Sequence, residues 1–113
     1  MDIKVTIVRA VQTSAGLPSQ WDVWTSTGQY LYLRYRHGHG TATAFDSNDW
    51  ETWGRKPLGD VASFGYGGDW DGFIELDVFC QQAGFELAPD LDYTGYGAYA
   101  AAELTRLLEE KEE

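Results

Sequence analysis

Apolar and polar residues alternate along residues 30–36, whose sequence is Tyr-Leu-Tyr-Leu-Arg-Tyr-Arg. Alternate side chains of a β-strand point to opposite faces of its sheet. Leu31, Leu33 and Tyr35 are therefore expected on the core side. The opposite side would carry two aromatic rings and two guanidinium groups, those of Tyr30, Tyr32, Arg34 and Arg36. This strand is either the polar outer face of a sheet or a binding surface.

Similar alternation predicts further strands on both sides of this segment. The four candidates are residues 2–11, 21–25, 41–45 and 61–64. The connections at 26–29 and 37–40 are short and contain glycine, so the strands that they join are expected to be antiparallel neighbours. The sequence therefore predicts an antiparallel meander of four to five strands.

The apolar spacing changes to that of a helix in the second half of the chain. One helical face at i, i+3, i+4 and i+7 is formed by Leu76, Phe79, Cys80 and Ala83. This predicts a short helix at about 75–83, which Gly84 would end. Residues 85–97 contain Pro89 and two glycines and are expected to be irregular.

An alanine-rich segment predicts a C-terminal helix at about 98–110. Its inward face would consist of Ala100, Leu104, Leu107 and Leu108. Glutamates follow at the end of the chain, where they meet the negative end of the helix dipole, so residues 110–113 are expected to fray. With 113 residues and 43% apolar content, the chain is expected to form one α+β domain, both helices packed on the sheet.

The net charge of −10 is unevenly distributed. Residues 57–105 contain nine Asp or Glu and no Lys or Arg. This acidic half either keeps the protein soluble or forms an acidic face for a basic partner. The candidate acidic surface consists of Asp69, Asp71, Asp77, Glu86, Asp90 and Asp92.

The second candidate surface is aromatic and cationic. It comprises Trp24, Tyr30, Tyr32, Arg34 and Arg36, which are residue types that dominate protein-binding hot spots. The alternative is that the C-terminal helix covers these rings. Direct binding of nucleic acid is disfavoured, because such binding depends on neutralising phosphates and the chain is acidic.

No motif of catalysis is present, and neither a metal nor a cofactor is expected. His37 and His39 lack an evident third zinc ligand. Cys80 lies on an apolar helical face near acidic residues, which predicts a buried, unreactive thiol. If the protein binds a small ligand, polar groups converge best around Arg34, Arg36, His37 and His39.

The N-terminal residues lack the features of a signal peptide, and no apolar run is long enough to span a membrane. A single cysteine suits a reducing compartment. The expected location is therefore the cytoplasm.

Three stretches carry a resemblance: Trp21-Asp22-x-Trp24-Thr25, residues 28–36, and Asp71-Gly72-x-Ile74-x-Leu76-Asp77-x-Phe79-Cys80 with Ala83-Gly84. Over residues 17–87 the chain resembles small uncharacterised proteins of actinobacteriophages. The resemblance implies a non-enzymatic accessory protein in the host cytoplasm that binds a host or phage protein. Alternatives are an acidic nucleic-acid mimic that inhibits a basic nucleic-acid-binding or defence protein, a self-assembling structural component, and a small-ligand-binding protein.

Overall fold

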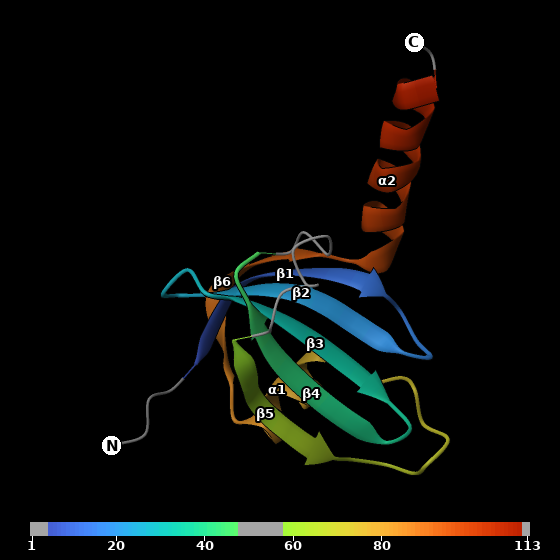
Figure 1. The fold of residues 1–113 in the computed structure, drawn as a ribbon. Helices are drawn as coiled ribbons and strands as arrows, with labels where there is room; N and C mark the ends of the chain where they lie inside the picture. The colour runs from blue at the N-terminus through green and yellow to red at the C-terminus, as the bar shows by residue number, and fades with distance from the viewer. Residues whose placement is uncertain (1–4, 48–57, 112–113) are drawn as a thin grey trace.

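Strand β3 (Tyr30–Arg36) lies in the middle of a six-stranded sheet with the order β5-β4-β3-β2-β1-β6 (Figure 1). The structure, a computed structural model, describes residues 5–47 and 58–111. The other strands are β1 (Thr6–Ser14), β2 (Ser19–Thr25), β4 (His39–Phe45), β5 (Gly59–Gly65) and β6 (Glu86–Thr94). The two helices are α1 (Leu76–Ala83) and α2 (Tyr96–Lys111). The predicted α+β class is confirmed. Residues 2–4 of the first predicted strand lie outside the described ranges.

The predicted meander is confirmed from β1 to β5, where all neighbouring strands are antiparallel. Gly28 supplies a positive φ of 87° in the turn between β2 and β3. The turn between β3 and β4 has two central residues with positive φ, His37 at 55° and Gly38 at 71°. This is the type I′ geometry that matches the twist of a hairpin, so β3 and β4 pair along their whole length.

The expectation that residues 85–97 are irregular is wrong, because Glu86–Thr94 forms β6 and pairs with β1 in parallel. The pairing is interrupted between Leu87, opposite Ile7, and Asp92, opposite Arg9. Pro89 lies in this interruption, on an edge strand, where its missing N–H removes no bond from the interior of the sheet. Pro89 therefore weakens the strand pattern in the sequence but does not prevent these residues from forming a strand.

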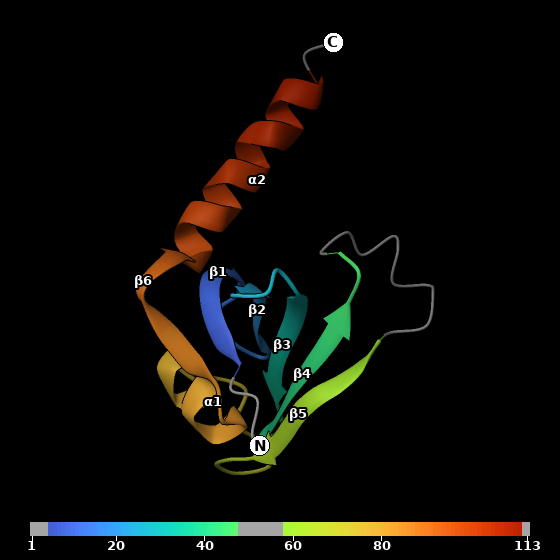
Figure 2. The ribbon, with the colours of Figure 1, turned by 90° about the vertical axis from the view of Figure 1, so that its left-hand side faces the viewer.

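Helix α1 packs on the inner, concave side of the sheet and contacts β4, β5 and β6 (Figure 2). Its predicted apolar face is confirmed, with Phe79 fully buried. The Phe79 ring meets Trp21 and Phe64 edge to face, with centroids 5.9 and 4.8 Å away. Gly84, at φ 81°, ends the helix as predicted, and the N–H of Phe85 donates to the Cys80 carbonyl in a Schellman motif.

Helix α2 is separated from β6 by the single residue Gly95 and projects away from the sheet (Figures 1 and 2). Its first turn is held by β1, where the Tyr96 N–H donates to Gln12 Oε1 at 3.3 Å. The molecule accordingly measures 53 Å along its longest axis and 33 and 32 Å along the others.

The expected inward orientation of the α2 leucines is wrong. Leu104, Leu107 and Leu108 are 58%, 48% and 54% exposed. Since residues 86–94 are used as a strand, only Gly95 joins β6 to α2, and the chain has no loop with which to fold the helix back. Helix α2 is described through Lys111, so fraying at the terminus stays a prediction.

We expect Gly40→Ala to destabilise the fold, because a Cβ at this position would lie 2.3 Å from the Phe64 ring. Overpacking of this kind costs about 1–3 kcal/mol of the free energy of unfolding. In Gly97→Ala a new Cβ has no neighbour within 4 Å, and the change should stabilise α2 by up to about 1 kcal/mol. Urea unfolding of the two variants tests the contrast, and equal effects would contradict this packing.

Cys80 should react with a thiol reagent only on unfolding. Burial, and to a lesser extent the charge of Asp77, raises the pKa of its thiol to about 12. Above about pH 8.5 an unfolded chain loses this proton while the folded chain keeps it, so this group's contribution to the free energy of unfolding falls as the pH rises. Labelling kinetics with and without denaturant check the prediction, and fast labelling of the folded protein would refute it.

Candidate functional site

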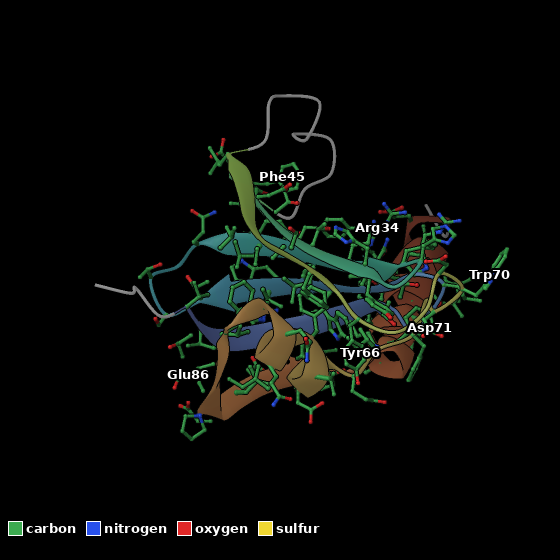
Figure 3. The ribbon with its side chains drawn as sticks, turned by 90° about the horizontal axis from the view of Figure 1, so that it is seen from below. Arg34, Phe45, Tyr66, Trp70, Asp71 and Glu86 are labelled. Atoms are coloured by element: carbon green, nitrogen blue, oxygen red, sulfur yellow. The ribbon has the colours of Figure 1, made fainter. Side chains whose placement is uncertain are left out.

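The outer face of the sheet, opposite α1, is arranged in rows across the strands. Leu31, Leu33 and Tyr35 are buried in the core as predicted, so the alternate residues of β3 lie on the outer face. Arg34 lies there, away from α1 (Figure 3). The register of β2, β3 and β4 fixes the cross-strand pairs: Trp24 with Tyr30, Tyr30 with Phe45, Arg34 with Thr41, and Arg36 with His39.

Tyr30, expected on an exposed binding surface, is only 3% exposed. Its hydroxyl donates to Asp22 Oδ1 at 2.5 Å, and its ring lies 5.6 Å from that of Trp24. The guanidinium of Arg9 lies 4.7 Å above the Trp24 ring. Tyr30 therefore belongs to a second buried layer that supports the outer face and does not contact a partner itself.

The buried polar groups of this layer are coupled. Burial raises the pKa of the Asp22 carboxyl, and the hydrogen bond from Tyr30 opposes that rise. Burial and the same hydrogen bond both raise the pKa of Tyr30. The phenol thus keeps its proton and remains the donor to Asp22, which fixes the position of the ring.

The first turns of α2 approach the outer face near Asp22. Burial raises the pKa of Tyr99, and the charges of Glu103 and Asp22 raise it further. Trp24 and Tyr32 are half-buried. The rings of Trp24, Tyr30 and Tyr32 are therefore at least partly covered, whereas α2 packs mainly against β1 and leaves its leucines exposed.

A cationic hollow opens where β3 turns into β4. It has a volume of about 210 Å³ and is lined by Arg34, Arg36, His37, His39 and Thr41. The structure thus brings together the Arg34, Arg36, His37 and His39 side chains that the sequence suggested for a small-ligand site. Thr41 was missed, although the antiparallel register places it opposite Arg34. None of the described residues that line the hollow carries a carboxylate.

The turn beside the hollow is held by the loop that follows β5. His37 Nδ1 lies 3.2 Å from the Asp69 carbonyl oxygen, which can only accept, so this nitrogen carries the proton. The Gly38 N–H donates to the Asp71 carbonyl at 2.9 Å. Asp71 Oδ2 in turn accepts from the Gly68 N–H at 2.7 Å. These bonds fix the turn and occupy the Asp71 carboxylate within its own loop.

The six residues of the candidate acidic surface are all exposed, but they do not form one continuous tract. Asp71 and Glu86 lie toward opposite ends of the molecule (Figure 3). Asp92 on β6 lies 3.9 Å from Arg9, and Asp77 lies in the first turn of α1. The negative charge is therefore distributed over several surfaces.

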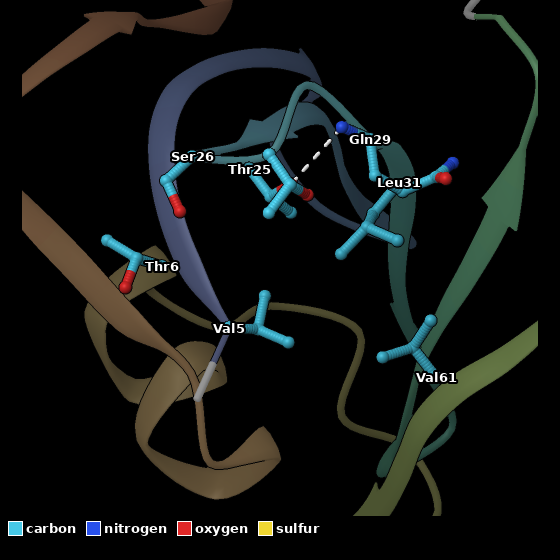
Figure 4. Close-up of a pocket in the computed structure, with 8 residues that line it drawn as sticks. Val5, Thr6, Thr25, Ser26, Gln29, Leu31 and Val61 are labelled. Carbon is cyan, nitrogen blue, oxygen red and sulfur yellow. Dashed lines mark hydrogen bonds between the residues drawn. The ribbon is translucent and has the colours of Figure 1, made fainter. Parts of the chain in front are cut away.

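A second hollow, of about 160 Å³, opens at the other end of the sheet (Figure 4). Its lining residues are Val5, Thr6, Thr25, Ser26, Thr27, Gln29, Leu31 and Val61. Thr25 and Thr27 hydrogen-bond to each other at 2.9 Å, and Gln29 Nε2 donates to the Tyr30 and Phe45 carbonyls. Because these polar groups already have partners, the hollow offers few groups for a ligand. Sequence reasoning missed it because its lining comes from the ends of separate strands.

Residues 5–47 and 58–111 contain no cluster of three or more His, Cys, Asp or Glu that could hold a metal ion. Within the same residues, no helix has the length and apolar character needed to cross a membrane. Comparison with protein-family models, curated proteins and solved structures gives no significant match for the chain.

Proposed function

We propose that this chain is a non-enzymatic binding protein that docks onto another protein through α2. One observation carries the proposal: the projecting helix exposes Leu104, Leu107 and Leu108 along one face. A helix that offers apolar residues at i, i+3 and i+4 is the form recognised by a hydrophobic groove.

The energetics favour a partner. An isolated helix of about 16 residues is marginal in water, because most helical stability in proteins comes from packing an apolar face. Beyond its first turns, the side chains of residues 101–110 are exposed except for the half-buried Glu103, so this part of α2 has little packing. Burying a leucine side chain contributes about 1.5–3 kcal/mol, so three such residues supply a substantial part of a binding energy even after the costs of association.

The charge of α2 defines the chemistry of the partner. Glu103, Glu109 and Glu110 are on the same helix as the leucines. Arg106 is already paired with Glu103 and Glu110 at 2.9 Å each. The helix therefore fits an apolar groove with basic side chains at its rim. A second copy of this acidic chain would bring like charges together, which disfavours self-association.

The resemblance to actinobacteriophage proteins suggests that the partner is a host or phage protein, and a basic nucleic-acid-binding protein has the required charge. Imitation of nucleic acid would call for a row of carboxylates along one surface. The distribution of Asp71 and Glu86 over opposite ends of the molecule favours α2 instead.

To test this proposal, a photo-crosslinker placed at Glu103 would capture the partner from an actinobacterial lysate, and binding to the purified partner would then be measured. We expect Leu104→Gln with Leu108→Gln to weaken that binding at least about a hundredfold, since two buried leucines are lost. Binding of the wild type should weaken as salt is added, because the flanking charges are exposed.

The matched control is Ala98→Gln with Ala102→Gln, which changes two exposed positions on the other side of α2 without altering its charge and should bind as the wild type does. Circular dichroism verifies that both variants keep the helix. Light scattering supplies the opposing outcome: if the wild type is a dimer and the leucine variant a monomer, α2 is a self-association surface and the proposal is wrong. A partner that binds both variants equally would also overturn it.

A further inference from the structure

We propose that the cationic hollow is a binding site for the phosphate group of a small phosphomonoester. The site is separate from the leucine face of α2 and does not depend on the function proposed for that helix. It rests on the geometry and charge of the side chains that line the hollow.

Four of the lining side chains lie on the same face of one hairpin, as two neighbouring cross-strand pairs. Arg34 stands opposite Thr41, and Arg36 stands opposite His39, in two cross-strand pairs of the same hairpin. Directly opposed residues have Cβ atoms about 5 Å apart, and the next residue on the same face follows after about 7 Å. Long side chains at the corners of such a rectangle can converge on a tetrahedral oxyanion. His37, in the turn, adds a fifth group at the rim.

The two guanidinium groups have no acidic partner in the part of the chain that the structure describes. Among the described residues, neither Arg34 nor Arg36 forms an ion pair, although the chain has 18 acidic residues. Arg9 and Arg106, in contrast, each lie within 4.0 Å of a carboxylate. Adjacent like charges on one face of a sheet are unfavourable. A bound dianion would relieve this repulsion, whereas a neutral ligand would not.

Arg34 is also incompletely hydrogen-bonded. Its Nε–H is buried and has no acceptor among the described residues, which is a costly state for a charged donor. The turn beside it is held by the His37 and Gly38 hydrogen bonds to the Asp69 and Asp71 carbonyls. The donors are thus positioned before a ligand arrives, which reduces the ordering cost of binding.

The lining selects a phosphate over other anions. Guanidinium groups and a threonine hydroxyl are typical phosphate ligands, and two arginines match a dianion better than a single carboxylate. None of the described residues that line the hollow is a Phe, Tyr or Trp, so these residues offer a nucleobase no such stacking surface. The net charge of −10 disfavours a long polyanion such as nucleic acid. The volume of about 210 Å³ suits a phosphate group on a small molecule.

Inorganic phosphate is the probe. In a ¹⁵N NMR titration at constant ionic strength, the amide signals of residues 34–41 should shift saturably in the millimolar range or below, and acetate should bind about tenfold more weakly. Arg34→Gln with Arg36→Gln should weaken phosphate binding by about a hundredfold, since two charge-assisted hydrogen-bonding groups are lost. Arg36→Gln alone should also weaken phosphate binding. It changes an exposed position and leaves the half-buried Arg34 in place.

The matched control is Arg9→Gln with Arg106→Gln, which removes the same charge outside the hollow and should leave phosphate binding unchanged. Equal weakening in this control would show a general charge effect and overturn the site. The absence of a saturable shift in the wild type would do the same. A single-stranded oligonucleotide that binds far more tightly than phosphate, and shifts the same signals, would replace the proposal with a nucleic-acid site.

Discussion

The edge-to-face contacts of Phe79 with Trp21 and Phe64 hold the fold together. Trp21 belongs to β2, near the middle of the sheet, and Phe64 belongs to the edge strand β5. Aromatic pairs of this kind contribute about 0.5–1.5 kcal/mol beyond the burial of their surface. Through this contact α1 joins strands that do not pair with each other. The concave side of the sheet is thereby filled by a helix that contacts both edge strands, β5 and β6.

The packing of the inner side of the sheet determines which residues lie on its outer side. With the apolar residues of β3 committed to the core, alternation leaves its tyrosines and arginines on the outer face. Near β2 this face is closed by the Asp22–Tyr30 pair. Toward the hairpin at His37 and Gly38 it stays open, and the cations remain accessible there. The same strand therefore supplies both a buried polar layer and an open hollow.

The local part of the fold was predictable from the sequence. The alternation in residues 30–36 and the helical spacing from Leu76 to Ala83 are short-range signals, and both were right. The parallel pairing of β6 with β1 was not predictable, because Pro89 weakens the strand pattern and the partner lies far away in the chain. The error in the α2 leucines is connected with this one, since the use of residues 86–94 as a strand leaves only Gly95 between β6 and α2.

The candidate site was also predictable only in part from the sequence. The convergence of Arg34, Arg36, His37 and His39 follows from the register of one hairpin, which the glycine at position 38 already indicated. The burial of Tyr30 depends on Asp22 and Trp24 from a neighbouring strand, and strand periodicity alone cannot report it. Periodicity gives the face of a residue, whereas its exposure depends on tertiary packing.

The parallel β1–β6 pair has a consequence for the synthesis of this chain. Thr6 pairs with Glu86. During synthesis on a ribosome, the outer edge of β1 therefore stays uncovered until β6 has been made. The antiparallel meander can form from its short hairpins much earlier, because their ends are close in sequence. Until residues 86–94 have left the exit tunnel, β1 is an unpaired edge, the state in which nascent chains pair with one another. Because α2 follows β6 in the chain, it leaves the tunnel only after the strand that covers this edge has emerged.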